Sequence, residues 1–119
     1  MSLKASTRQV DGITVMDLSG RITLGEGSVI LRDTVRDLLS KGSKKIVLNL
    51  ADVPYIDSAG LGEVVRTYTT VSRQGGSLKL LNLTKRITDL LSITKLLTVF
   101  ETFESEPEAV RSFSASAKV

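Results

Sequence analysis

The sequence predicts a single α/β domain: a mixed, mostly parallel sheet with an N-terminal antiparallel hairpin, packed against about four helices. Short apolar runs rich in β-branched residues alternate with stretches whose apolar residues recur every three or four positions. The dipeptide Asp11-Gly12 separates the first two apolar runs and is a strong signal for a two-residue hairpin turn. The length of 119 residues allows one sizeable hydrophobic core.

Along the chain, the hairpin is followed by helix, strand, helix, strand, helix, strand and helix. Strands that alternate with helices pair in parallel through right-handed crossovers, so only the opening hairpin is expected to be antiparallel. We expect the domain to span residues 7–113, with flexible ends at 1–6 and 114–119. The expected strands are 7–10, 13–18, 46–50, 78–83 and 99–103, and the expected helices are 28–40, 58–74, 84–91 and 105–113.

The first elements follow from turn signals and helical periodicity. Segment 13–18 is apolar at most positions, as in a strand covered on both faces. Segment 19–27 contains three glycines but lacks the Gly-Lys-Ser/Thr ending of a phosphate-binding loop, so we interpret it as a plain loop. In the helix that follows, Leu31, Val35 and Leu38 fall on one face.

The stretch 46–62 organises the rest of the chain. It opens with the apolar run 46–50, expected to be a buried strand, and Pro54 excludes an ordinary helix across the following junction. An amphipathic helix begins near Ser58, because Leu61 and the apolar residues three, four and seven positions later share one face. Such a turn leaves backbone N–H groups and the positive end of a helix dipole at the surface. Ser58 lies at that point.

The last third of the chain completes the alternation. Leucines in segment 78–83 define another strand, and Thr84 is a suitable N-cap for a short helix. A short strand near 99–103 comes next. Pro107 stands in the first turn of the last helix, where its missing N–H costs little.

Composition excludes several kinds of function. The chain has no histidine and no cysteine, which excludes a Ser-His-Asp triad, a Cys-His pair and a thiolate or imidazole metal site. We therefore expect neither enzymatic activity nor a cofactor. The net charge is +3, but the basic residues are distributed along the chain and alternate with acidic ones. Only five residues are aromatic, so nucleic acid is not an expected partner. No apolar run is long enough to cross a bilayer, and the lack of cysteine fits the cytoplasm.

Three hypotheses address Ser58. Serine and aspartate are both good N-caps, so Ser58 or Asp57 could simply cap the helix. A catalytic nucleophile on a strand-to-helix turn is disfavoured, because Ile56 stands where such an elbow has glycine and no histidine can act as base. Regulatory phosphorylation is the third hypothesis, because a helix N-terminus has free N–H donors for a phosphate.

The hexapeptide Asp57-Ser58-Ala59-Gly60-Leu61-Gly62, preceded by the strand 46–50 and by Tyr55-Ile56, resembles the signature of the STAS domain. The branch it most resembles is that of the bacterial anti-sigma factor antagonists. The resemblance extends over about residues 7–113 and includes the hairpin at Asp11-Gly12.

This resemblance implies a regulatory switch. In that family the unmodified antagonist binds an anti-sigma factor that is itself a serine kinase, which releases a sigma factor for transcription. The kinase phosphorylates the antagonist with ATP, and a PP2C-type phosphatase restores it. The acceptor serine matches Ser58, and the acid that helps to place it matches Asp57. The implied partner-binding residues are Asp52, Asp57, Ala59, Gly60, Leu61, Gly62, Thr23 and Glu26.

The chain departs from the family at one loop. Many members have Gly-Glu-x-Asp where this chain has Gly20-Arg21-Ile22-Thr23, and this difference bears on the identity of the partner more than on the fold.

Other functions are compatible with the domain. Similar domains also serve as partner-binding subunits of bacterial lipid transporters or as stress-signalling scaffolds without a kinase cycle. Nucleotide binding has been suggested for such domains, but the chain lacks a Walker-type lysine. Nothing in the sequence indicates an oligomeric state.

Overall fold

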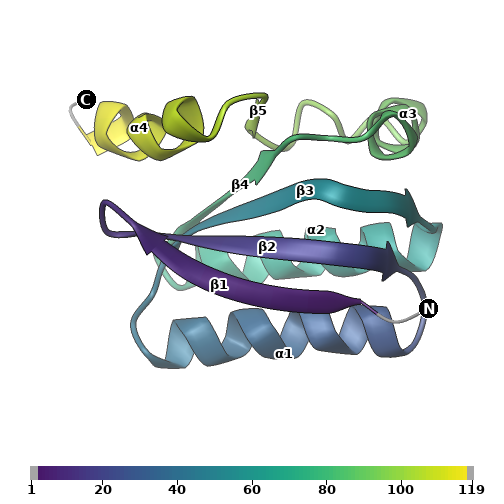
Figure 1. Ribbon diagram of the computed structural model, residues 1–119, viewed down its shortest axis with the longest axis horizontal. Coiled ribbons are helices and arrows are strands. Elements are labelled where there is room, and N and C mark those ends of the chain that lie inside the picture. The colour runs from purple at the N-terminus through teal and green to yellow at the C-terminus, as the bar shows by residue number, and fades with distance from the viewer. Residues whose placement is uncertain (1–2, 118–119) are drawn as a thin grey trace.

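The computed structural model describes residues 3–117, which form one five-stranded sheet with strand order β1-β2-β3-β4-β5 (Figure 1). β1 and β2 are antiparallel and the other neighbours are parallel, which confirms the predicted fold class. The elements are β1 (Lys4–Val10), β2 (Ile13–Ile22), α1 (Glu26–Ser40), β3 (Lys45–Ile56), α2 (Ser58–Arg73), β4 (Ser77–Leu81), α3 (Lys85–Ile93), β5 (Thr102–Phe103) and α4 (Glu106–Ala117).

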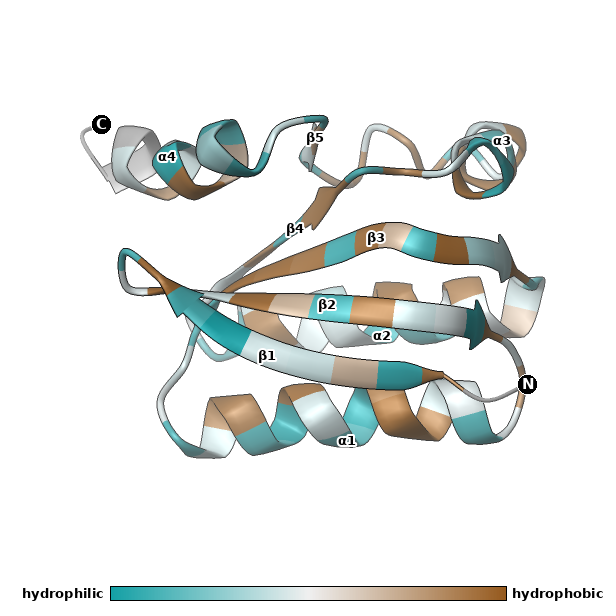
Figure 2. Ribbon diagram, viewed as in Figure 1, coloured by the Kyte–Doolittle hydropathy of each residue, from teal (hydrophilic) through white to brown (hydrophobic). Residues whose placement is uncertain are grey.

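Helices cover the two faces of the sheet unequally. α1 and α2 lie side by side on one face, and their apolar residues form the larger core with β2 and β3 (Figure 1). α4 lies on the opposite face, where Val110 and Phe113 pack with Val15, Val47 and Leu81 in a second cluster. The edge strand β1 is mostly hydrophilic, whereas β2 and β3 carry the apolar segments (Figure 2). None of the described helices is long and apolar enough to span a bilayer.

Three strands are longer than the sequence predicts. β2 continues from the predicted 13–18 to Ile22, so the segment 19–27 is not a plain loop: its first four residues are strand, and α1 begins at Glu26. β1 begins at Lys4, which pairs with Ser19, and Leu3 is buried, so residues 3–6 belong to the folded domain rather than to a flexible lead. β3 continues through Pro54, because its pairing with β4 ends at Asn49 and the missing N–H removes no ladder bond on that side. α4 continues to Ala117, so residues 114–117 of the expected flexible C-terminal end are helical. Residues 1, 2, 118 and 119 of the expected flexible ends lie outside the described residues.

A network of charged side chains ties the open face of the sheet to α4. The Arg8 guanidinium contacts Asp17 through Nε–Oδ2 at 2.7 Å and Glu106 through Nη2–Oε1 at 2.5 Å. Asn49 Nδ2 donates to Asp17 Oδ1 at 2.8 Å. Hydrogen bonds from Arg8 hold the pKa of both carboxyl groups below its usual range. Arg8 therefore joins β1, β2 and the start of α4.

We expect Arg8→Gln to lower the free energy of unfolding by about 1 kcal/mol at pH 7, a modest value because the side chains are partly exposed. Since the folded pKa values are depressed, the contribution is complete above the ordinary carboxyl pKa and is lost as pH falls through the folded values. Denaturant unfolding of both proteins from pH 7 to about pH 2 measures it. Arg111→Gln, an exposed change on α4, is the control; a pH-independent difference would contradict the assignment.

Candidate functional site

Asp57 stands between β3 and α2 and caps the helix. Its backbone is extended (φ −102°, ψ 179°), and its Oδ1 accepts a hydrogen bond from the N–H of Gly60 at 2.7 Å. Its Oδ2 accepts from the N–H of Leu24 at 3.3 Å, and its own N–H donates to the carbonyl of Ile22 at 3.3 Å. Asp57 therefore fastens the start of α2 to the loop after β2.

Ser58 is the first residue of α2 and is exposed to solvent. Its hydroxyl makes no hydrogen bond with any residue that the structure describes. The N-cap role belongs to Asp57, so the capping hypothesis for Ser58 is wrong. The Asp57 carboxylate accepts backbone N–H groups with both oxygens, and no histidine is present to take a proton from Ser58. This arrangement presents a free hydroxyl without activating it as a nucleophile.

Two glycines allow both helices to start against the end of β2. A Cβ on Gly60 would lie 1.9 Å from the carbonyl oxygen of Ile22, and a Cβ on Gly27 would lie 2.7 Å from that of Arg21. Both distances are far shorter than van der Waals contact and both obstacles are backbone. Gly62 differs, since its Cβ would meet only the Arg66 guanidinium at 3.8 Å. Gly60 is thus a packing residue, whereas Gly62 leaves the surface beside Ser58 uncovered.

The predicted partner-binding residues differ in burial and in their position relative to Ser58. Ala59 and Gly62 are half-buried beside Ser58, but Gly60 and Leu61 are buried, so we remove these two from the docking surface. Thr23 and Glu26 belong to the segment that Asp57 fastens to α2, and Glu26 is exposed at the start of α1.

Asp52 lies elsewhere. It is exposed in β3 opposite Ser19, beside a hollow lined by residues of β1 and β2. The structure places it among the strands of the sheet and not on the turn itself.

The sequence did not reveal a stack of side chains beside this turn. The guanidinium carbons of Arg21 and Arg86 lie 5.2 Å and 4.6 Å from the ring centroid of Tyr55. Arg86 Nε also donates to the carbonyl of Ile56 at 3.1 Å. Leu24, on the loop that Asp57 holds, is 79% exposed. The segments that lead into the Ser58 turn therefore carry two arginines stacked on Tyr55 and one exposed apolar side chain.

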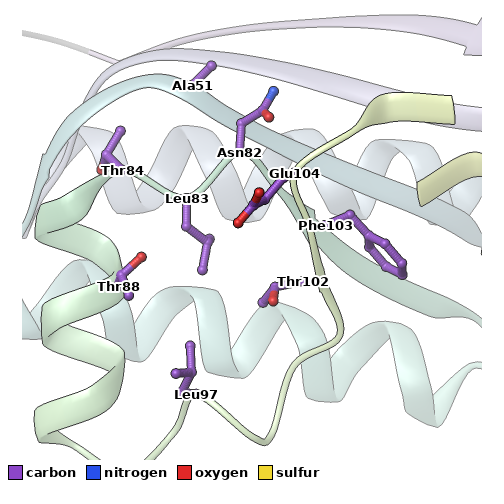
Figure 3. Close-up of a pocket in the computed structure, with 9 residues that line it drawn as sticks. All are labelled: Ala51, Asn82, Leu83, Thr84, Thr88, Leu97, Thr102, Phe103 and Glu104. Carbon is purple, nitrogen blue, oxygen red and sulfur yellow. The ribbon is translucent and has the colours of Figure 1, made fainter. Parts of the chain in front are cut away.

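A hollow of about 580 Å³ lies near the ends of β4 and β5 (Figure 3). Leu83 and Leu97 point toward one another across it (Figure 3). Asn82 Nδ2 donates to Asn49 Oδ1 at 3.2 Å and the Thr84 hydroxyl donates to a backbone carbonyl, so these polar groups serve the fold. Glu104 is the one ionisable residue among those that line it. The residues that line this hollow include no acid–base pair. Across the described residues, no group of three or more Asp or Glu side chains could hold a metal ion.

The family model for the STAS domain matches residues 4–109. The chain belongs to the STAS domain family. This STAS domain is 36% identical over 96 residues to the anti-sigma-B factor antagonist of Bacillus subtilis, covering 81% of this chain and 86% of that protein.

Solved structures share the STAS fold. An anti-sigma factor antagonist from Mycobacterium paratuberculosis superposes with a TM-score of 0.81 at 18% identity, covering 93% of each chain. The Bacillus cell fate determinant SpoIIAA, solved in its phosphorylated form, superposes with a TM-score of 0.72 at 19% identity, covering 92% of this chain and 99% of that one. These likenesses confirm the architecture.

We expect Asp57→Ala to lower the free energy of unfolding by about 1–2 kcal/mol, because it removes an N-cap. Ser58→Ala is expected to change it by less than about 0.5 kcal/mol, as for other exposed substitutions. Denaturant unfolding of the two variants beside the wild type gives both values. Equal losses would show that Ser58 shares the capping role.

Gly60→Ala is expected to lower the free energy of unfolding by about 2–4 kcal/mol, because its methyl group overlaps the Ile22 carbonyl. Gly62→Ala is the matched control: it should stabilise the helix by about 0.5–1 kcal/mol. Thermal and denaturant unfolding of both variants measure the difference. If the two substitutions have the same effect, the close approach of α2 to β2 does not constrain the turn.

Proposed function

We propose that this STAS domain is an anti-sigma factor antagonist that is switched off by phosphorylation of Ser58. In its unmodified form it binds an anti-sigma factor that is also a serine kinase, and this binding releases a sigma factor. The observation that carries the proposal is the exposed Ser58 hydroxyl, which has no hydrogen-bond partner among the described residues, at the start of a helix that Asp57 already caps. The names of the relatives support the same function.

The turn is suited to carry a phosphate without refolding. A phosphoryl group adds about −1.5 to −2 charge at pH 7 and three acceptor oxygens. The N–H groups of Ser58 and Ala59 belong to the first turn of α2 and have no acceptor within the helix. The helix dipole also favours a negative charge there. The bonds of Asp57 to Gly60 and Leu24 do not involve the Ser58 side chain, so they can persist after modification.

Phosphorylation is expected to act at the docking surface. This surface comprises Ser58, Asp57, Ala59 and Gly62 with the loop segment that contains Thr23 and Glu26. A phosphate buried there without a compensating cation would cost about 2–5 kcal/mol of binding free energy, together with repulsion from Asp57. That corresponds to roughly 30-fold to several-thousand-fold weaker binding.

The remaining parts of the proposal follow from this cycle. A PP2C-type phosphatase removes the phosphate, and the domain itself is not an enzyme. The cycle takes place in the cytoplasm, and neither nucleic acid nor a membrane is a partner. The reported relatives give no support to a transporter subunit or a scaffold without a kinase, so we do not propose those functions.

The direct test is incubation of the protein with purified anti-sigma factor kinase and Mg-ATP, followed by peptide mapping of phosphate by mass spectrometry. We expect phosphate on Ser58, no incorporation in Ser58→Ala, and normal incorporation in Ser72→Ala, which removes another exposed serine of α2. Binding of the kinase should fall at least about 30-fold on phosphorylation. Phosphate at another residue with Ser58 unmodified would falsify the proposal.

A further inference from the structure

A small hollow lies between α1 and α2, and none of the residues that line it belongs to the Ser58 turn. Its volume is about 70 Å³, and both helices contribute to its walls. This is room for several water molecules or one small ion. The polar residues that line it are Arg32, Arg36, Glu63, Arg66, Thr67 and Thr70.

Guanidinium groups outnumber carboxylates at this hollow. Glu63 is buried and accepts one hydrogen bond, from Arg66 Nη2 at 3.3 Å. Arg32 Nη1 lies 3.7 Å from Glu63 Oε1, and Arg32 Nε lies 3.7 Å from Oδ1 of the exposed Asp33. Both distances are too long for a hydrogen bond. Arg36 forms neither a hydrogen bond nor an ion pair with any described residue. Most of the guanidinium N–H groups that line this hollow therefore form no hydrogen bond with a described residue.

Thr67 supplies an independent observation. It is 4% exposed, and its hydroxyl is a buried side-chain group without a hydrogen-bond partner in the described part of the chain. The neighbouring threonines of α2 behave differently: Thr69 donates to the carbonyl of Val65 at 3.0 Å, and Thr70 donates to that of Arg66 at 2.9 Å. A buried hydroxyl is almost always satisfied, so Thr67 requires an acceptor or a donor inside the hollow.

We propose that this hollow binds a small tetrahedral oxyanion of the phosphate or sulfate class. Three guanidinium groups and one hydroxyl present donors from both helices, and a tetrahedral oxyanion offers acceptors in all of these directions. The single buried carboxylate, Glu63, leaves an excess of positive charge that favours an anion over a neutral water. The bound anion links α1 to α2, whose first turns hold Gly27 and Gly60 against the end of β2. The site is independent of the proposed modification of Ser58.

The test is a titration of the full ¹⁵N-labelled chain with inorganic phosphate, followed by two-dimensional NMR at ionic strength held constant with sodium chloride. We expect saturable shifts that concentrate around Arg36 and Thr67. Thr67→Val keeps the shape of the side chain and removes its hydroxyl, and it is expected to weaken binding about tenfold, as is Arg36→Gln. Arg73→Gln, an exposed change in the last turn of α2, is the matched control and should bind like the wild type.

A second arm replaces inorganic phosphate with O-phosphoserine, which distinguishes a free ion from a phosphate carried on a larger group. Binding of either compound that depends on Thr67 and Arg36 supports the site. Shifts that rise linearly without saturation, or that are unchanged in Thr67→Val and Arg36→Gln, overturn it and leave water as the partner of the Thr67 hydroxyl.

Discussion

The contact between the backbone of Gly60 and the carbonyl of Ile22 is the constraint on which the Ser58 turn depends. α2 can start directly above the end of β2 only because no side chain separates them at this position. That proximity brings the β2–α1 loop within reach of the Asp57 carboxylate, which then bonds both segments. Without the close approach, the same aspartate would cap α2 but would have no loop to hold.

The two faces of the sheet are stabilised in different ways. The face under α1 and α2 contains the larger core and sets the positions of both helix starts. The opposite face is covered by α4 over one part only, and polar side chains occupy the rest in a chain from Arg8 through Asp17 and Asn49 to Asn82. Those residues satisfy one another across neighbouring strands. The open part of the sheet is thus kept ordered by hydrogen bonds where no helix supplies apolar contacts.

Patterns that are local in the sequence predicted the fold and the strand-to-helix turn that holds the candidate site. The apolar run before Pro54 and the helical periodicity after Ser58 were sufficient to predict the strand-to-helix turn, and alternation of elements predicted parallel pairing. The start of β1 was missed because its first residues are polar and owe their strand conformation to pairing with β2. Asp57 and Ser58 are equally good N-caps by residue type, so only the backbone geometry distinguishes them.

Contacts between distant segments could not be predicted in the same way. Tyr55 and Arg86 are separated by a helix and a strand, and nothing in either local sequence indicates their stacking. Gly60 and Gly62 look alike in a helical segment, although one faces a carbonyl and the other faces open space. The difference depends on the path of β2, which is set by the whole sheet.

The exposure of Ser58 has a consequence for how the surface of this turn can change. The Ser58 side chain is exposed to solvent, whereas at Gly60, two residues further along, one added carbon would overlap the Ile22 carbonyl. The turn therefore leaves space for added atoms at Ser58, which faces solvent, but not at Gly60, which faces the sheet. A group added to Ser58 would therefore change the charge and shape of the surface that a partner contacts. The backbone of the turn would stay in place.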